Sequence, residues 1–497
     1  MPHYDAVIIG AGLGGLLCGN ILAREGMHVC VLEQNSVIGG GMQSFARNGV
    51  VFNTGLNYTE SLGEGETLNR YFSYFGILDQ LKLRRMDADG FERISFKGDD
   101  KEYPFAQGHD HFVETLASHF PKERENLRIY MNYLNEISSS FPLYSLDTKS
   151  QVIEGKYLQV NAFDYIKSTI GDTRLQQVLA GLNSLYGGVA DKTPLYVHAL
   201  INSSFIRSSW RLVDGSSQLP RAIAKTITNH GGVIRRKARV VKLGGEKSGI
   251  DYAELEDGER ITAKRFISNV HPSVTLNLVE DTITKRAHKQ RINQLPNTMG
   301  MFTLYLDFKP ETQPYLNFNH HHFAGENAWT TAYKQDEWPE HYMFYTPAIS
   351  KSEQWADGGV VITYMNYQEV AKWANTSIEN RGAEYEAFKQ KKAEQLIDFM
   401  AQKFPAIRDR IARYYTSTPL TYRDYTGTPE GSAYGILKDA NDPLSTIISP
   451  KSRVGNLYFT GQNLNMHGVL GVTIGAVLTC AEFFGTEYLM NKIKQHI

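Results

Sequence analysis

The chain has 497 residues, of which 42% are hydrophobic and 21% charged, a composition typical of globular proteins. At about 150 residues per domain, this length predicts two or three domains. The formal net charge is -1, so no basic field supports nucleic acid as a partner.

Residues 4–33 predict a β-α-β unit. Residues 6–9 form a short apolar run that is typical of a buried parallel strand. Apolar residues then recur at helical spacing until Gly26, which ends the predicted helix. Residues 29–32 form a second buried run, and Glu33 follows it directly.

The turn between the first strand and the helix carries the motif G-x-G-x-x-G. Gly10 permits the tight turn, Gly12 lets a pyrophosphate approach the backbone, and Gly15 lets helix and strand pack closely. The helix N-terminus offers free N–H groups to phosphates. Glu33 can accept both ribose hydroxyls of an adenosine and repels a 2′-phosphate, so NADP is disfavoured. The unit predicts a dinucleotide site, leaves NAD and FAD open, and has a ligand-free Rossmann-like unit as its alternative; its candidate residues are Gly10, Gly12, Leu13, Gly14, Gly15 and Glu33.

The next segment, EQNSVIGGGMQS (residues 33–44), is where a family resemblance enters. It resembles a group of flavoproteins, among them amine oxidases, carotenoid desaturases and retinol saturases, that often carries G-G-R-x-x-S/T here. Gly41 stands where the arginine is usual, and retinol-saturase-like members also lack that arginine. Those members continue with F-x-x-x-G-x-x-F-x-x-G, which Phe45, Gly49, Phe52 and Gly55 match, while Asn53 replaces the usual acid. The resemblance implies FAD contacts by Gly39, Gly40, Gly41 and Ser44.

Two later segments resemble further parts of the same flavin domain. Residues 215–243 predict a helix, a glycine turn and a strand, and a hairpin over 255–267 follows; the resemblance implies that Val240 meets the adenine through its backbone. Residues 454–485 predict a strand, a turn and a helix that begins near Val469. In the group, this closing motif holds the flavin, and its helix N-terminus stabilises negative charge on the reduced ring. The resemblance implies contacts by Gly461, Asn463, Gly468 and Val469, with Asn463 in place of the usual aspartate.

The fold class implied is α/β: a Rossmann-like FAD-binding domain of the amine oxidase/GDI type, interrupted by an α+β substrate domain with a mixed sheet. The expected FAD-binding parts are 1–85, 206–275 and 436–497, and the expected substrate parts are 86–205 and 276–435. Within the latter, residues 111–137 predict an amphipathic helix broken at Pro121, and residues 301–308 alternate as a strand does.

Three further features bear on chemistry. The basic-aromatic stretch 70–87 is expected to be core, with contact to a membrane surface as the alternative. His320, His321 and His322 point to different sides of a strand, so no metal site is expected. Tyr58 and His467 are candidate proton donors, since hydride addition to C=C also needs a proton; a structural role is the alternative for each.

The resemblance to the family of phytoene desaturases, carotenoid isomerases and retinol saturases implies an FAD-dependent oxidoreductase acting on C=C bonds of an apolar isoprenoid or polyene. An amine-oxidase-like enzyme and a non-catalytic, GDI-like lipid-binding protein are the alternatives. The sequence has no second G-x-G-x-x-G unit, so a diffusible electron donor or acceptor is expected. Three cysteines without metal spacing and the lack of a basic N-terminal region favour a cytoplasmic location.

Overall fold

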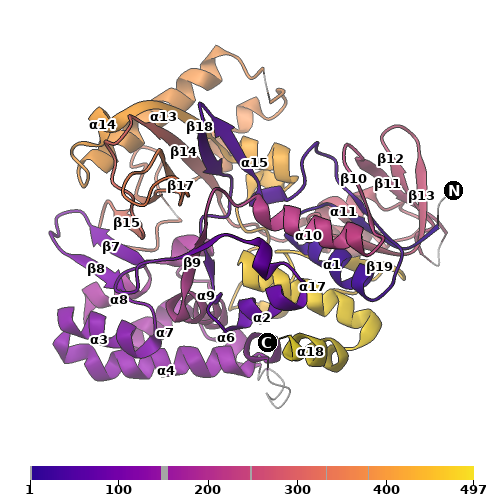
Figure 1. Cartoon of the computed structure of the whole chain (residues 1–497), viewed down its shortest axis with the longest axis horizontal. Helices are drawn as coiled ribbons and strands as arrows, with labels where there is room; N and C mark the ends of the chain where they lie inside the picture. Colours follow the sequence, from indigo (N-terminus) through magenta and orange to yellow (C-terminus); the bar gives the residue numbers. More distant parts are fainter. Residues whose placement is uncertain (1–2, 147–154, 247–248, 332, 379, 497) are drawn as a thin grey trace.

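Two seven-stranded sheets organise the computed structural model, which describes residues 3–146, 155–246, 249–331, 333–378 and 380–496. Figure 1 shows one sheet near the N-terminus, with strands β10 to β13, and the other on the opposite side, with strands β7, β8, β14, β15, β17 and β18 labelled. Each sheet combines segments that lie far apart in the sequence.

The first sheet has the strand order β10-β2-β1-β13-β12-β11, and β19 also pairs with β13. Strands β10, β2, β1, β13 and β19 are parallel, and a hairpin adds β12 and β11 antiparallel to them. Helices α1 (Leu13–Arg24), α10 (Gln218–Asn229) and α17 (Gly468–Phe484) pack together beside it. The strands are β1 (His3–Ile9), β2 (Val29–Leu32), β10 (Val233–Arg235), β11 (Val240–Gly244), β12 (Tyr252–Leu255), β13 (Arg260–Ser268) and β19 (Leu457–Phe459).

This sheet confirms the β-α-β unit, the hairpin and the closing strand-turn-helix segment. Its β1 and β2 are buried over nearly their whole length, which explains their continuous apolar runs. Residues from the start, middle and end of the chain share one sheet. The boundaries expected between the FAD-binding and substrate parts stay predictions.

The second sheet has the order β18-β14-β17-β16-β15-β7-β8 and is antiparallel except for the pair β15 and β7. Strand β14, next to the edge strand β18, is buried at every residue, so its alternating side chains do not alternate between buried and exposed positions. One of its faces packs in a core with α13 (Ala383–Ala401), and Tyr305 on the other contacts Phe52. The strands are β7 (Glu92–Phe96), β8 (Glu102–Phe105), β14 (Gly300–Phe308), β15 (Asn319–Phe323), β16 (His341–Tyr345), β17 (Gly358–Met365) and β18 (Ile411–Ser417).

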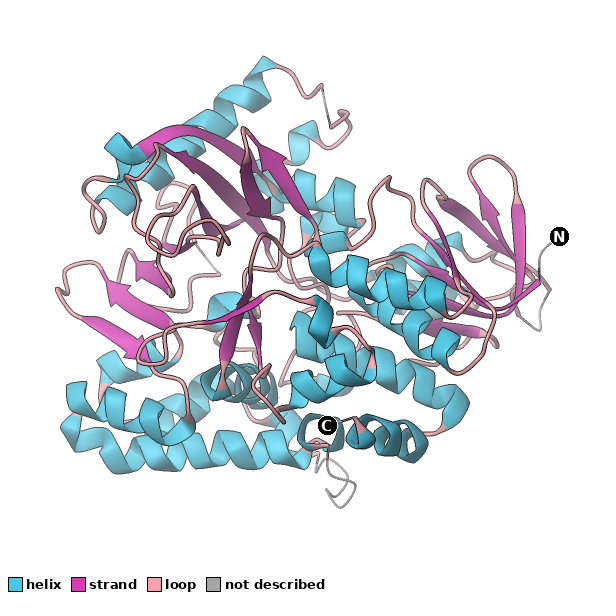
Figure 2. Cartoon of the chain, in the orientation of Figure 1, coloured by secondary structure: helices cyan, strands magenta, loops and turns pink. Residues whose placement is uncertain are grey.

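A helical layer covers one side of the molecule, at the bottom of Figure 2. The break expected at Pro121 is present, as a 3-10 turn, Pro121–Glu123, between α3 and α4. Within the described residues, no helix is both long and apolar enough to cross a bilayer. The principal helices of the layer are α3 (His109–His119), α4 (Arg124–Ser140), α7 (Ala162–Thr169), α8 (Thr173–Leu179) and α9 (Leu195–Arg207).

Two small sheets lie in the parts of the chain that join these layers. The hairpin β3 (Ser44–Arg47) and β4 (Val50–Asn53) follows the second glycine cluster, and a three-stranded sheet has the order β5-β9-β6. The basic-aromatic stretch supplies α2 (Thr67–Tyr74), whose aromatic side chains are buried, as expected for core. The strands of the small sheet are β5 (Thr59–Glu60), β6 (Leu83–Arg85) and β9 (Ser209–Leu212).

Candidate active site

The first glycine turn is as tight as its sequence predicts. Gly10 has φ of +91°, a conformation that favours glycine. A Cβ on Gly15 would lie 2.1 Å from the carbonyl oxygen of Gly10, so helix α1 reaches its strand only because Gly15 has no side chain. This confirms the packing role predicted for Gly15.

A second glycine loop lies against the first. The Gly39 N–H donates to the Ala11 carbonyl at 2.8 Å, and Gly12 and Gly39 form a bridge. A Cβ on Gly40 would sit 3.4 Å from the Cα of Gly12, whereas one on Gly41 would have no neighbour within 4 Å. At Gly41 the second loop therefore borders open space as bare backbone, which is the surface that a pyrophosphate and ribityl chain require.

Asn269, which directly follows β13, lies between the first glycine turn and the closing motif, and its sequence context did not mark it. A Cβ on Gly12, Gly14 or Gly461 would lie 2.5–2.6 Å from the side-chain amide of Asn269. Its backbone N–H donates to the Ile9 carbonyl at 2.9 Å, which fixes the end of β13 beside β1. The contact places Gly461, from the closing motif, directly beside the first glycine turn.

Glu33 lies at the end of β2, buried beside the same turn. Its carboxylate accepts the Ala11 N–H at 2.9 Å and the Asn35 N–H at 2.8 Å, each on a different oxygen. Burial raises the pKa of Glu33, and these hydrogen bonds oppose that shift. Each oxygen keeps acceptor capacity for a ribose hydroxyl. The Ala238 N–H donates to the Glu33 carbonyl at 2.8 Å and brings the strand of Val240 close to it.

The hydroxyl of Ser44 lies in a hydrogen-bond network with the middle segment. It donates to Asn53 Oδ1 at 3.1 Å and accepts the Ser217 N–H at 3.1 Å. Asn53 Oδ1 also accepts the Ser216 N–H at 2.9 Å. Ser44 and Asn53 thus fasten the second loop to residues 215–217, and the FAD contact expected of Ser44 stays a prediction.

The closing motif presents the N-terminus of α17. Gly461 (φ +93°) and Gly468 (φ +76°) are in the glycine region, and Val469 is buried in the first turn. Asn463 accepts the Ile436 N–H at 3.1 Å. Glu60, a buried carboxylate that the sequence did not single out, accepts the Leu470 N–H of this turn at 3.1 Å. Burial raises the pKa of Glu60.

A cavity of about 80 Å³ lies between the second sheet and the segment at Gly55, where a Cβ would lie 2.8 Å from the Gly41 carbonyl oxygen. No carboxylate lines it among the described residues, and most of its lining atoms belong to apolar or aromatic side chains. It is lined by Gly55 and Asn57, which follow the second glycine loop, by Ser184 and Leu185, by Met301, His341, Met343, Ile362, Thr363 and Tyr364 of the second sheet, and by Tyr422, Ala433 and Tyr434.

The two candidate proton donors lie beside this cavity in different environments. The His467 Nε2–H donates to the Leu185 carbonyl at 2.9 Å, and burial lowers the pKa of His467 to about 4. A neutral ring bonded in this way has no second proton to give, so the geometry favours the structural alternative for His467. Tyr58 is buried, its hydroxyl has no hydrogen-bond partner among the described residues, and burial together with Glu92 raises its pKa well above the usual value.

Comparison with known proteins decides the family. The profile of flavin containing amine oxidoreductases matches residues 13–479. The chain belongs to this family. It is 24% identical to human all-trans-retinol 13,14-reductase, over 99% of this chain and 87% of that protein. It is 25% identical to prolycopene isomerase 1 from an Oncidium hybrid cultivar, over 99% of this chain and 85% of that protein. An oxidoreductase structure from Methanosarcina mazei aligns with a TM-score of 0.65 at 15% identity, over 95% of this chain and 98% of that one.

The protein is therefore an FAD-dependent oxidoreductase with the α/β fold expected from the sequence. The bare-backbone cradle fits the cofactor: Gly41 borders open space, and Glu33 retains acceptor sites. When bound, FAD supplies hydride exchange with a substrate. The individual FAD contacts of the residues named from sequence stay predictions.

Proposed function

We propose that this flavoenzyme acts on a carbon–carbon double bond of an apolar isoprenoid or polyene. The observation that carries the proposal is the cavity: it adjoins the flavin cradle, and its lining offers methionine, leucine, isoleucine and tyrosine side chains but no carboxylate among the described residues. Apolar lining favours an uncharged substrate, because a buried cation without an opposite charge is costly. The relatives that act on retinol and prolycopene support the same choice.

Different residues of the chain have different roles in this reaction. The glycine loops and Glu33 hold the cofactor, and the walls at Ile362 and Met343 orient the apolar substrate and exclude water. At about 80 Å³ the cavity takes the reacting portion of such a molecule. We propose that electrons come from, or go to, a diffusible partner, and that the enzyme is cytoplasmic, with peripheral membrane contact as a route for a lipid.

A direct test uses the cofactor as the reporter. The purified holoprotein is photoreduced without oxygen and mixed with all-trans-retinol or with a poly-cis carotene, and the return of flavin absorbance is followed. We expect reoxidation that depends on polyene concentration, with a product changed in mass or in double-bond geometry by chromatography.

The second candidate is oxidation of an amine, which the family name admits. It is tested by mixing oxidised enzyme with primary and secondary amines in the same apparatus. Fast flavin reduction by amines, together with no reoxidation by any polyene, would overturn the proposal. Membership of an oxidoreductase family argues against the non-catalytic lipid-binding alternative. A yellow protein whose flavin is neither reoxidised by polyenes nor reduced by amines would favour that alternative.

A further inference from the structure

Alternation along β15 divides its three histidines between the two faces of the second sheet. His320 and His322 lie on one face, where both contact the Ser95 hydroxyl and their rings pack against Phe404 and Phe399. His321 lies on the other face, which also carries His341 and the cavity-lining Met343. Only His321 is therefore on the side of the cavity.

On the cavity side, two histidines and a carboxylate form a continuous chain of hydrogen bonds. His341 lines the cavity, and its Nε2 lies 3.1 Å from Nδ1 of His321. The opposite nitrogen of His321, Nε2, lies 3.0 Å from Oε2 of Glu92. All three side chains are buried, and among the described residues Nδ1 of His341 has no hydrogen-bond partner.

At the Glu92 end of this hydrogen-bond chain, neighbouring groups stabilise negative charge. Oε1 of Glu92 accepts from the Asn319 amide at 2.8 Å, and the Asn319 oxygen accepts from Arg211 at 2.9 Å. Arg211 is fully buried, and its only other hydrogen bonds among the described residues go to the backbone carbonyls of Leu316 and Phe318. A buried carboxylate is tolerated where a cation and hydrogen bonds compensate it. The phenol of Tyr58 also lies beside Glu92.

We propose that His341, His321 and Glu92 are a proton relay that opens on the cavity at His341 and exchanges one proton with the substrate there. The inference rests on the proposed function and adds to it the group that handles the proton. His341 is assigned as the catalytic residue, because it lines the cavity; His321 and Glu92 are positioning residues that act through it.

The relay supplies the one proton that saturation of a double bond requires. The substrate gains a hydride, for which reduced FAD is the source, and one proton. In the loaded state Glu92 is a carboxylic acid, and the ring protons lie on Nδ1 of both histidines. A substrate carbon takes the Nδ1 proton of His341 and forms a C–H bond with an electron pair of the double bond. The Nδ1 proton of His321 then moves to Nε2 of His341, and the Glu92 proton moves to Nε2 of His321. Glu92 ends as the carboxylate, and both rings are neutral before and after.

The surroundings of His341 agree with a neutral ring at this residue. Burial, and then the neighbouring histidines His321, His322 and His320, lower the pKa of His341 well below its usual value. The groups that face the relay are Glu92 from β7, Arg211 from β9, and Tyr58, which directly precedes β5. The one cation among them lies at the Glu92 end, so negative charge collects there and not on the substrate.

The test compares Glu92→Gln with a matched variant on the other face of the same sheet. Glu102→Gln removes a carboxylate 3.5 Å from His320, away from the cavity. In holoprotein photoreduced and mixed with all-trans-retinol, we expect Glu92→Gln to slow flavin reoxidation by about 100-fold at unchanged half-saturating retinol, and Glu102→Gln to stay within about threefold of wild type. Flavin absorbance and the melting temperature verify that each variant folds and binds FAD.

His341→Gln is the second variant, in case Glu92→Gln does not fold. We expect it to cause a loss of similar size, and the double variant to lose no more than either single one, because the groups act as one unit. Losses that multiply, or a Glu92→Gln rate like that of Glu102→Gln, would overturn the relay.

A readout without turnover separates the relay from the proposed function. In holoprotein labelled with ¹⁵N-histidine, the signals of His321 and His341 are assigned from their glutamine variants. We expect Glu92→Gln to shift the ring nitrogens of His341 as well as those of His321, and Glu102→Gln to shift neither. If no polyene reoxidises the flavin but these shifts are seen, the substrate proposal fails and the relay stands. Unchanged His341 signals overturn the relay whatever the substrate.

Discussion

Individual glycines of the cradle lie in two different surroundings, crowded and open, which the distances from a Cβ at each position separate. Gly15 has no room for a side chain because the protein itself fills the space, at 2.1 Å from the Gly10 carbonyl. Gly41 has no protein atom within 4 Å of a Cβ and does not adopt a positive φ. A side chain at Gly15 conflicts with the fold, whereas one at Gly41 meets no protein atom, and we expect it to conflict only with a bound ligand.

This difference predicts the behaviour of Gly41→Ala. We expect the cofactor-free variant to melt at the temperature of cofactor-free wild type, and its affinity for FAD to fall by about tenfold, the effect of about 1.4 kcal/mol. Isothermal titration with FAD measures the affinity. Gly325→Ala is the matched control, because Gly325 also has no atom within 4 Å but lies away from the cradle. Equal FAD affinity in the two variants would show that Gly41 does not face the cofactor.

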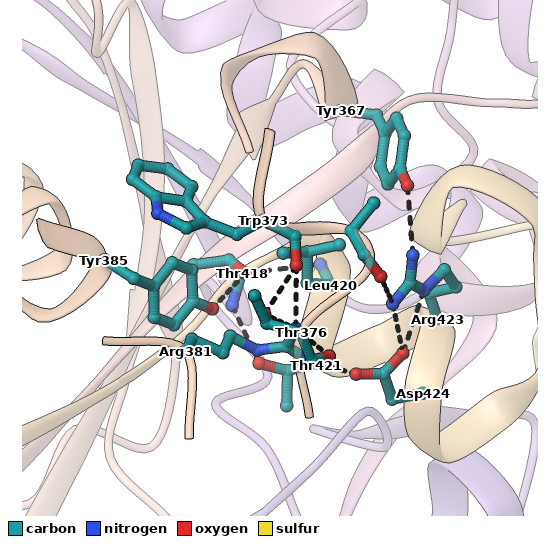
Figure 3. Close-up of polar contacts among 11 residues, drawn as sticks. Tyr367, Trp373, Thr376, Arg381, Tyr385, Thr418, Leu420, Thr421, Arg423 and Asp424 are labelled. Atoms are coloured by element: carbon teal, nitrogen blue, oxygen red, sulfur yellow. Dashed lines mark hydrogen bonds and ion pairs between the residues drawn. The ribbon is translucent and has the colours of Figure 1, made fainter. Parts of the chain in front are cut away.

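At the scale of elements, the position of α15 (Pro419–Thr426) depends on a buried polar cluster, shown in Figure 3. Asp424 of this helix pairs with both Arg381 and Arg423, and Arg381 also donates to the Trp373 and Thr376 carbonyls. The same helix carries Tyr422, whose hydroxyl bonds Thr303 of β14 at 2.7 Å and whose ring lines the cavity. The cluster thus holds one wall of the active site.

Removing the shared carboxylate tests this role. The side chain of Arg381 is only 3% exposed, so Asp424→Asn leaves a buried cation without its partner. We expect the free energy of unfolding to fall by about 3 kcal/mol, measured by urea denaturation of the holoprotein. Asp398→Asn breaks an exposed pair with Arg408 and is expected to cost about 0.5 kcal/mol or less. Similar losses in the two variants would contradict the account of the cluster.

Elements and residues differed in how far the sequence predicted them. The units β1-α1-β2 and β19-α17 have local signals, apolar periodicity with glycines at the turns, and both were predicted. Glu92 and His321 are 229 residues apart, and Glu60 and Leu470 are 410 apart. Nothing near Glu92 or Glu60 in the sequence marks a partner, because strand pairing between distant segments creates these contacts. Asn269 was missed for the same reason.

At the scale of the whole molecule, several histidines in different elements of the fold are buried in the neutral state. Burial lowers the pKa of His198 to about 3 and the pKa values of His271 and His322 to about 4. His198 lies between the hydroxyls of Tyr130 and Tyr186, at 2.6 and 2.9 Å. Each of these rings would have to take up a proton in acid without a carboxylate bonded to it.

These groups predict that acid destabilises the protein below about pH 6.5, the usual histidine pKa. From there down to about pH 4 the unfolded chain binds protons that the folded chain does not, so stability falls as the pH falls. At pH 5 each such histidine contributes about 2 kcal/mol of the loss. Urea denaturation at pH 7, 6 and 5 measures it, and His198→Gln should reduce the loss between pH 7 and 5 by about that amount. His230→Gln, at an exposed position, should leave the pH dependence as in wild type; parallel curves for all three proteins would mean that His198 is not a neutral buried ring.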